Sequence, residues 1–542
     1  MLNKIFELPT QIRNWIEPNL HICLSSRQPT IWLIALIVGL AVSLVAIMFR
    51  EGIGYVQYLW LQDISENVVT AAQNKPWYVI LLAPTIGGLV VGQFLVRLLP
   101  MRRTEAVADV IEAGAPGARK MDIRTAFLSA ITTVISLGSG ASAGREGPIV
   151  HLGAAISSYA AEKLKLADGS RTTLLACGVA AAVSASFNAP IAGVLFAHEV
   201  ILGHYAKRAF VPIVIASVAG TLLSRAWFGD VAAFIIPEYQ ITSLWEFPAF
   251  ALLGVICAIV SIAFQFSLIG TNNIARAIKV PLWFKPVLGG FMVGAIAIVF
   301  PEVLGVGYEA TDQALHNQLA LYLLLSLLVA KIIATAITLG FGFGGGVFSP
   351  ALYIGAMVGG AFGLIAAQFF PDMASSQGLY SILGMGAVAA AILGAPISTT
   401  IIIFELTGGY ALTIALLLVV SVSTGINQAI HGRSYFQWQL ELRGLFIQRG
   451  PHRQLMNSIK VMDFMKPLDT PGSKAAHEEL APHALKSSHN LERALRNFDI
   501  SGHQTLPVID EADPDKIIAW ASRVDALSQF NNALVAISEE EH

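Results

Sequence analysis

Up to about residue 441, the chain consists of apolar stretches long enough to cross a lipid bilayer, which takes about 20 residues of helix. They lie near residues 31–49, 77–98, 125–144, 209–223, 248–270, 285–300, 319–339 and 409–426. Shorter apolar stretches, broken by Gly or Pro, lie near 147–161, 172–202, 340–370 and 381–406. Only 13% of the residues are charged, against roughly 25% in soluble chains. The pattern predicts an all-α polytopic membrane protein.

The composition changes after residue 441. Residues 441–542 are rich in charged residues and histidine and are predicted to lie in the cytosol. Asn490–Phe498 has a helical pattern, and the apolar runs Thr505–Asp510 and Lys516–Trp520 flank an Asp/Pro turn, which favours two short strands. Arg523–Leu527 is typical of a helix start. This region is therefore predicted to be a cytosolic linker followed by a small α/β domain.

Other features of the chain exclude some functions. Residues 1–30 alternate charged and apolar groups, which predicts an N-terminal interfacial helix and not a cleavable signal peptide. The net charge of −2 gives no sign of a nucleic-acid partner, and none is expected. The three cysteines are far apart, which favours packing over a disulfide or a metal site. No metal ligand, catalytic residue or required cofactor is predicted.

The apolar region contains an internal repeat. Gly147–Gly153 matches Ser349–Gly355, with a glycine five residues after the proline in both. Asn188–Glu199 matches Gly394–Glu405, with the glutamate nine residues after the proline in both. The two pairs are offset by 202 and 206 residues, so repeats are predicted at about 77–225 and 285–430. Matching short helices broken by Gly and Pro are typical of transporters with a site at the repeat interface, although the sequence leaves parallel and inverted repeats open.

A charged pair, Arg145-Glu146, lies in the middle of this apolar sequence, within Gly144–Pro148. No other charged residue occurs between Arg124 and Glu162. An ionisable group at membrane depth is costly and usually marks an ion or proton path. Glycines on both sides allow close approach, and a proline suits the first turn of a helix. The segment is therefore predicted to be a helix N-terminus directed at an anion, with a carboxylate beside it.

Three motifs identify a family. Gly144–Pro148, Gly346–Pro350 and Phe187–Gly193 resemble the signatures of the CLC chloride channel and transporter family. The resemblance covers about residues 31–440. It implies an inverted repeat of tilted and half-crossing helices, and a homodimer in which each subunit has its own pore for chloride and other small anions. It also implies a multi-pass protein of the cell membrane, and the compact tail favours a bacterial inner membrane.

The resemblance also assigns roles to residues. Glu146 matches the gating glutamate, whose carboxylate competes with the anion until protonation or chloride moves it aside. The alternative is a buried structural pair with Arg145, which is itself expected to shape the field more than to contact the anion. The expected anion-binding residues are Gly144, Arg145, Gly147, Gly346, Val347, Phe348 and Phe436. The C-terminal domain resembles a single CBS motif without a clear second copy, and an adenine nucleotide is its candidate ligand.

The chain departs from the family pattern at the inner half of the predicted pore. The usual Gly-Ser-Gly-Ile-Pro motif, whose serine contacts the central anion, is absent, and Met101–Glu105 stands in its place. Arg102, Arg103 and Thr104 are candidate replacement donors. The alternative is that the two arginines are ordinary positive residues of a cytosolic loop. Phe436 occupies the position of the pore tyrosine, which keeps the ring and loses the hydroxyl.

A further departure concerns protons. Proton-coupled members carry a glutamate where this chain has Val200, which cannot relay protons, so the relay is predicted to be absent. His198 is a weaker candidate for that role. Glu199 and its repeat partner Glu405 are interpreted as satisfied structural carboxylates.

These features predict a gated chloride channel, voltage-gated as in the family, and not an enzyme. The first alternative is a chloride/proton antiporter with an atypical internal proton path. A remote alternative is an intramembrane serine hydrolase, because Gly140–Gly144 fits Gly-x-Ser-x-Gly. That motif needs a preceding strand and a base, and neither is indicated. Gly340–Gly345 matches a loose dinucleotide pattern but lacks its βαβ context.

Overall fold

The computed structural model describes residues 28–115, 120–230, 234, 239–407, 412–445, 456, 459–473, 480–511, 513 and 515–541. Within these ranges, nine helices are long and apolar enough to cross a membrane. The interfacial helix expected at residues 1–30 lies almost wholly outside the described residues, since only its last three positions are described. Those positions are the start of the first long helix.

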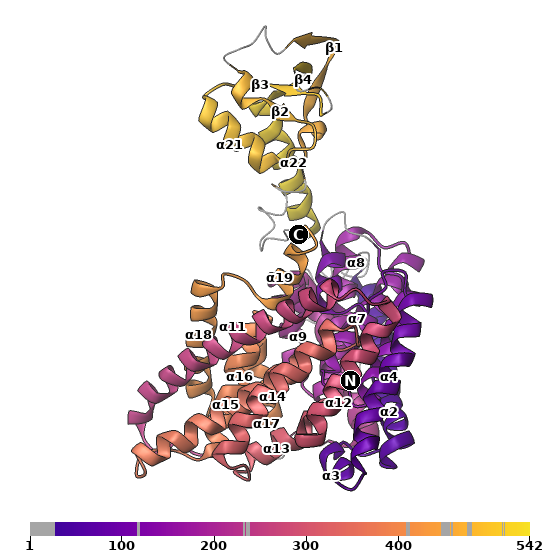
Figure 1. Cartoon of the computed structure of the whole chain (residues 1–542). Coiled ribbons are helices and arrows are strands. Elements are labelled where there is room, and N and C mark those ends of the chain that lie inside the picture. Colours follow the sequence, from indigo (N-terminus) through magenta and orange to yellow (C-terminus); the bar gives the residue numbers. More distant parts are fainter. Residues whose placement is uncertain are drawn as a thin grey trace, which may run out of the picture. The chain divides into compact units, whose positions relative to one another are not determined.

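The region before residue 443 is a bundle of helices of unequal length (Figure 1). Its α-helices are α2 (Gln28–Leu61), α3 (Val68–Gln73), α4 (Trp77–Arg97), α5 (Val107–Gly114), α6 (Ile123–Gly138), α7 (Glu146–Lys163), α8 (Asp168–Phe187), α9 (Pro190–Phe196), α10 (Lys207–Phe228), α11 (Phe247–Ala277), α12 (Lys285–Val299), α13 (Tyr308–Leu315), α14 (Leu321–Gly340), α15 (Phe348–Phe369), α16 (Gln377–Leu393), α17 (Pro396–Thr407), α18 (Thr413–Ile430) and α19 (Tyr435–Glu441). A π-helical turn, Ala197–Leu202, continues α9. Helices α3 and α13 lie at one end of the bundle, and α19 lies at the other (Figure 1).

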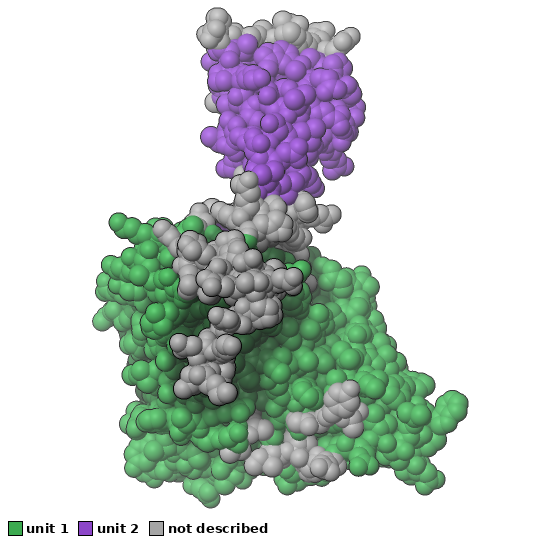
Figure 2. Space-filling view, turned by 180° about the vertical axis from the view of Figure 1, so that it is seen from behind, with its two compact units in different colours: residues 1–113, 120–443 green, residues 114–119, 444–542 purple. Residues whose placement is uncertain are grey.

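The chain forms two compact units, residues 1–113 with 120–443 and residues 114–119 with 444–542 (Figure 2). In the first unit, the paired helices α7/α8 and α15/α16 cross at glycines. A Cβ built on Gly178 would lie 2.3 Å from the carbonyl oxygen of Gly153, and one built on Gly384 would lie 2.2 Å from that of Gly355. These four glycines hold corresponding places in the predicted repeats, so the two halves use the same crossing.

The second unit is the predicted small α/β domain. Its four strands are β1 (Met465–Ser473), β2 (Leu485–Lys486), β3 (Thr505–Ile509) and β4 (Lys516–Ser522). They form one sheet in the order β1-β4-β3-β2, in which only β2 and β3 pair in parallel. Asn490 caps the start of α21 (Leu491–Ser501), and α22 (Arg523–Glu541) follows β4 directly. The two strands and two helices expected from the sequence are present.

Candidate functional site

The two signature segments meet at Gly144 and Gly346. The N–H of each glycine donates to the carbonyl oxygen of the other at 2.7 Å, which makes an isolated antiparallel bridge. Helix α7 begins at Glu146 and α15 at Phe348, so both helices start next to this bridge. The first N–H groups of a helix have no partner within it and carry its partial positive charge. The bridge therefore brings two positive helix ends to one place, while its own two N–H groups are already paired.

The carboxylate of Glu146 lies over this bridge and is buried, with 2% of the residue exposed. Its Oε1 accepts hydrogen bonds from the Ser349 hydroxyl at 2.6 Å and from the Tyr308 hydroxyl at 3.4 Å. Its Oε2 has no hydrogen-bond partner among the described residues. A Cβ built on Gly144 would lie 2.7 Å from that Oε2 and 3.1 Å from the backbone nitrogen of Ser349. The carboxylate thus lies against the N-terminus of α15.

Arg145 takes part in a cluster next to α3. Its guanidinium pairs with Glu66, which also pairs with Arg50 at 2.9 Å, and it lies 4.8 Å above the ring of Tyr308. Burial disfavours the charge of Glu66, but the two arginines outweigh this effect, so the pKa of Glu66 is lowered. A longer contact, 3.9 Å, joins Arg145 Nε to Glu146 Oε1. Arg145, Glu66, Arg50 and Tyr308 line a cavity of about 210 Å³.

The segment that replaces the missing serine motif, together with the next residue, Ala106, lies close to the first signature segment and to the loop just before the second. A Cβ built on Gly344 would lie 3.1 Å from Cγ2 of Thr104, and one built on Gly147 would lie 3.7 Å from Cβ of Ala106. Of the three candidate donors, Thr104 therefore lies beside the second signature loop. Arg102 is exposed.

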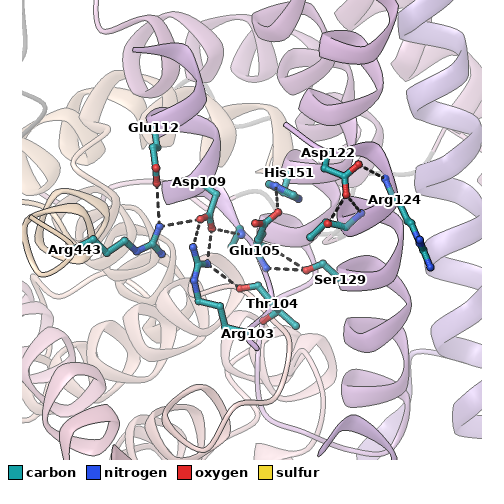
Figure 3. A network of polar contacts seen from close by, with 12 residues as sticks. Arg103, Thr104, Glu105, Asp109, Glu112, Asp122, Arg124, Ser129, His151 and Arg443 are labelled. Carbon is teal, nitrogen blue, oxygen red and sulfur yellow. Dashed lines mark hydrogen bonds and ion pairs between the residues drawn. The ribbon is translucent and has the colours of Figure 1, made fainter. Parts of the chain in front are cut away.

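The guanidinium of the third candidate, Arg103, is bound by the carboxylate of Asp109. It donates to both oxygens of Asp109, at 2.5 and 3.0 Å, and Arg443 donates to the same carboxylate at 2.8 Å (Figure 3). Burial opposes ionisation of Asp109, but these guanidinium groups lower its pKa to about 2. Arg103 is thus part of an ion-pair cluster at the end of the helix bundle where the chain leaves the first compact unit, at Arg443.

Glu105, which is partly exposed, pairs with the buried His151, and no sequence motif predicted this contact. Their Oε2 and Nε2 atoms are 3.2 Å apart, and Figure 3 shows the imidazole facing the carboxylate. The two residues are far apart in the chain and belong to no shared motif. A signal was nevertheless present, because His151 is aligned with Tyr353 in the repeated Gly-Pro motif and so breaks an otherwise apolar or aromatic pattern.

The third motif and the expected pore aromatic belong to the same apolar core. The ring of Phe187 lies 4.8 Å from that of Phe348, so the third motif packs on the second. Phe436 is buried in the cluster that also contains Val347 and Phe348. Ser434 caps its helix, α19, in a reciprocal arrangement with Gln437.

The carboxylates near Val200 accept hydrogen bonds from backbone N–H groups. Glu199 accepts from the backbone N–H groups of Ile397 and Ser398 at 3.1 and 2.7 Å, at the start of α17. Glu405 accepts in the same way from Ile191 and Ala192, at 3.0 and 2.7 Å, at the start of α9. Each repeat therefore caps a helix of the other.

The residues on either side of Glu199 are His198 and Val200. His198 is buried, with its Nδ1 2.9 Å from the carbonyl oxygen of Val194, and Val200 is apolar.

Comparison with known proteins identifies the family. The model of the family described as "Voltage gated chloride channel" matches residues 87–428. The chain belongs to the CLC family. It is a multi-span membrane protein of a family that transports anions, which agrees with the helices and motifs described above.

Relatives support this assignment over most of the chain. A putative ClcB-like chloride channel protein of Ralstonia nicotianae is 33% identical over 71% of this CLC chain and 90% of its own length. The crystal structure of a slow cyanobacterial Cl⁻/H⁺ antiporter is similar with a TM-score of 0.70 at 23% identity, covering 77% of this chain and 99% of the other. That of a eukaryotic CLC transporter gives 0.65 at 18% identity, covering 93% and 88%. The two structures share the fold.

The geometry of this CLC chain offers no support for the remote hydrolase alternative. Helix α6, and not a strand, precedes the Gly-x-Ser-x-Gly motif. Ser142 Oγ lies 3.5 Å from the Thr335 hydroxyl, and its backbone N–H donates to Thr338 at 3.1 Å. No nucleophile–base pair forms there among the described residues.

Proposed function

We propose that this CLC protein is a gated chloride channel, with a separate anion path in each subunit of a homodimer and the carboxylate of Glu146 as the gate. The observation that carries the proposal is the position of that carboxylate. It lies at the bridge where the starts of α7 and α15 converge, which is where a small anion would be attracted.

The chemistry of gating follows from this position. Backbone N–H groups at helix ends attract an anion with partial charges, strongly enough for entry and weakly enough for release. The ionised carboxylate is itself an anion and competes for the same donors. When it is protonated, its attraction to the helix ends falls, and chloride can take its place. Ser349 holds the carboxylate in the closed position at 2.6 Å.

A passive channel is favoured over proton exchange by the inner residues. Val200 cannot bind a proton, and Glu199 is occupied by the start of α17. The second candidate function, chloride/proton antiport, is favoured by the Glu105–His151 pair, which offers a proton-binding site away from Val200. The reversal potential under a proton gradient at fixed chloride separates the two. A shift with pH would contradict the channel.

Glu146→Gln tests the gate. In sealed membrane vesicles of a single orientation, chloride flux is measured while the pH on the α3/α13 side changes and the pH on the other side stays constant. The variant has a permanently neutral side chain, so we expect high flux that is independent of this pH. If it kept the wild-type response, Glu146 would not be the gate.

Ser349→Ala is the matched control. It removes the hydroxyl that holds the gate closed but leaves a titratable carboxylate. We expect flux at neutral pH to rise roughly tenfold, which corresponds to a hydrogen bond of about 1.4 kcal/mol. The response to pH should persist, with its midpoint at a higher pH.

A further inference from the structure

The pair Glu105–His151 has an unused proton-binding atom. His151 is 2% exposed, and its Nε2 lies 3.2 Å from Glu105 Oε2. An ionised carboxylate only accepts hydrogen bonds, so Nε2 carries the hydrogen, and the lone pair of a neutral imidazole is then on Nδ1. This Nδ1 is buried without a hydrogen-bond partner among the described residues. The Glu105 side chain is 14% exposed, which gives the pair a connection to solvent.

The pair lies beside the proposed anion path. Glu105 is between Thr104, which approaches Gly344 just before the second signature segment, and Ala106, which approaches Gly147 in the first. Its backbone is fixed by Ser129, whose hydroxyl accepts from the Glu105 N–H at 2.8 Å. A change in the charge of this pair therefore changes the electrostatic potential along the proposed anion path.

The surrounding charges compensate one another. Arg103 and Arg443 converge on Asp109, and Arg443 also lies 3.5 Å from Glu112 (Figure 3). On α6, Asp122 caps the helix beside Arg124. On α7, Glu146 accepts a hydrogen bond from the Ser349 hydroxyl. With two cations against two anions in the Asp109 cluster, the pair itself determines the local net charge: negative when His151 is neutral, and zero when it is protonated.

The second repeat shows that the fold does not require such a pair. The positions 202 residues further along are Gly307 for Glu105, Tyr353 for His151 and Lys331 for Ser129. Gly307 has no side chain, and the Tyr353 ring packs against it. The titratable pair is therefore present in the first repeat and has no counterpart at the corresponding positions of the second.

We propose that Glu105 and His151 form a second protonatable site of the anion path, which takes protons from the side of the membrane where Arg443 leaves the bundle and controls how readily anions occupy the path. The sequence predicts this side to be the cytosol. A proton from that compartment binds Nδ1 of His151, and the resulting imidazolium neutralises Glu105. Acidification of this side then favours anion entry. This proposal rests on the proposed function in one respect, because it assumes that the anion path passes the Gly144–Gly346 bridge.

The test uses the full chain with Glu146→Gln. In this variant residue 146 cannot bind a proton, so any remaining response to pH must come from another group. Chloride flux is measured in vesicles of a single orientation while the pH on the Arg443 side varies and the other side stays constant. We expect flux to fall about fivefold as the pH on that side is raised, because a neutral His151 no longer balances the charge of Glu105. Adding His151→Gln should abolish this response. Adding Glu105→Gln should keep the response but move it to lower pH, because the carboxylate stabilises the imidazolium.

His198→Gln is the matched control, since His198 is equally buried but bonded through Nδ1. It should leave the response unchanged. A response that survives His151→Gln, or disappears with His198→Gln, overturns the proposal. The midpoint with Glu105→Gln gives an independent result if the His151 variant does not fold, and an unmoved midpoint would also contradict it. None of these outcomes alters the expected behaviour of Glu146→Gln toward the opposite side.

Discussion

The segment from α6 to α9 and the segment from α14 to α17 have the same backbone features at corresponding positions. Gly144 in the first faces Gly346 in the second, and each is followed by a helix that starts two residues later. The helices cross their neighbours at glycines in both. The glutamates that end the motifs cap each other's helices. What the two repeats share is therefore close packing and backbone hydrogen bonding.

The side chains differ where they meet ions. Glu146 corresponds to Phe348, His151 to Tyr353, and Ser129 to Lys331. The first repeat has a carboxyl group and an imidazole at these positions, whereas the second has aromatic rings and one buried lysine. Substitutions at shared positions should consequently have equal effects in both repeats, and substitutions at differing positions should have unequal effects.

The largest equal effect is expected at the helix crossings. Gly178→Ala and Gly384→Ala each place a methyl group 2.3 Å or less from a carbonyl oxygen, so the helices must separate. We expect each to reduce the free energy of unfolding by about 3 kcal/mol, at the upper end of the cost of overpacking. Thermal unfolding in detergent measures this.

Gly425→Ala in α18 is the control for both, because a Cβ there has no neighbour within 4 Å. It should leave the stability unchanged or slightly increased, as alanine favours helix more than glycine does. A large loss in only one of the two crossings would show that the repeats are packed differently.

An unequal effect is expected at Lys331 and Ser129. Lys331 is fully buried in α14 and donates to the carbonyl oxygens of Val303 and Gly305, at 3.0 and 3.1 Å. Ser129 fixes the corresponding loop through one residue, Glu105. Lys331→Met leaves two carbonyl groups without a partner and should cost about 2 kcal/mol, whereas Ser129→Ala should cost about 1 kcal/mol. Equal costs in an unfolding titration would contradict the difference between the two loops.

The features predictable from the sequence are those with a local pattern. Apolar length predicted most of the spans, and the spacing of Gly, Pro and Glu predicted the repeat and its paired motifs. Apolar length was wrong for the stretch 125–144, where α6 has only 16 residues, and for the broken stretches 172–202 and 340–370, where α8 and α15 are long enough to span.

Gly144 and Gly346 were both expected to bind the anion, but their backbone N–H groups donate to each other's carbonyl oxygens. The motifs could not show this, because a motif records residue types and not hydrogen bonds. The Glu105–His151 contact was missed for a related reason. It joins a loop to a helix, and no periodicity connects them.

The smallest equal effect is expected at the mutual caps. Glu199→Gln and Glu405→Gln replace one carboxylate oxygen by an amide that cannot accept a hydrogen bond, and they remove the negative charge from a helix N-terminus. Each should lower the stability by about 1 kcal/mol. Glu199 also accepts from the Ser398 hydroxyl at 2.6 Å, so its variant should be slightly the more costly. If Glu199→Gln instead abolished a proton flux that Glu405→Gln preserved, Glu199 would have a role in transport that its repeat partner lacks, and the equivalence of the two caps would be lost.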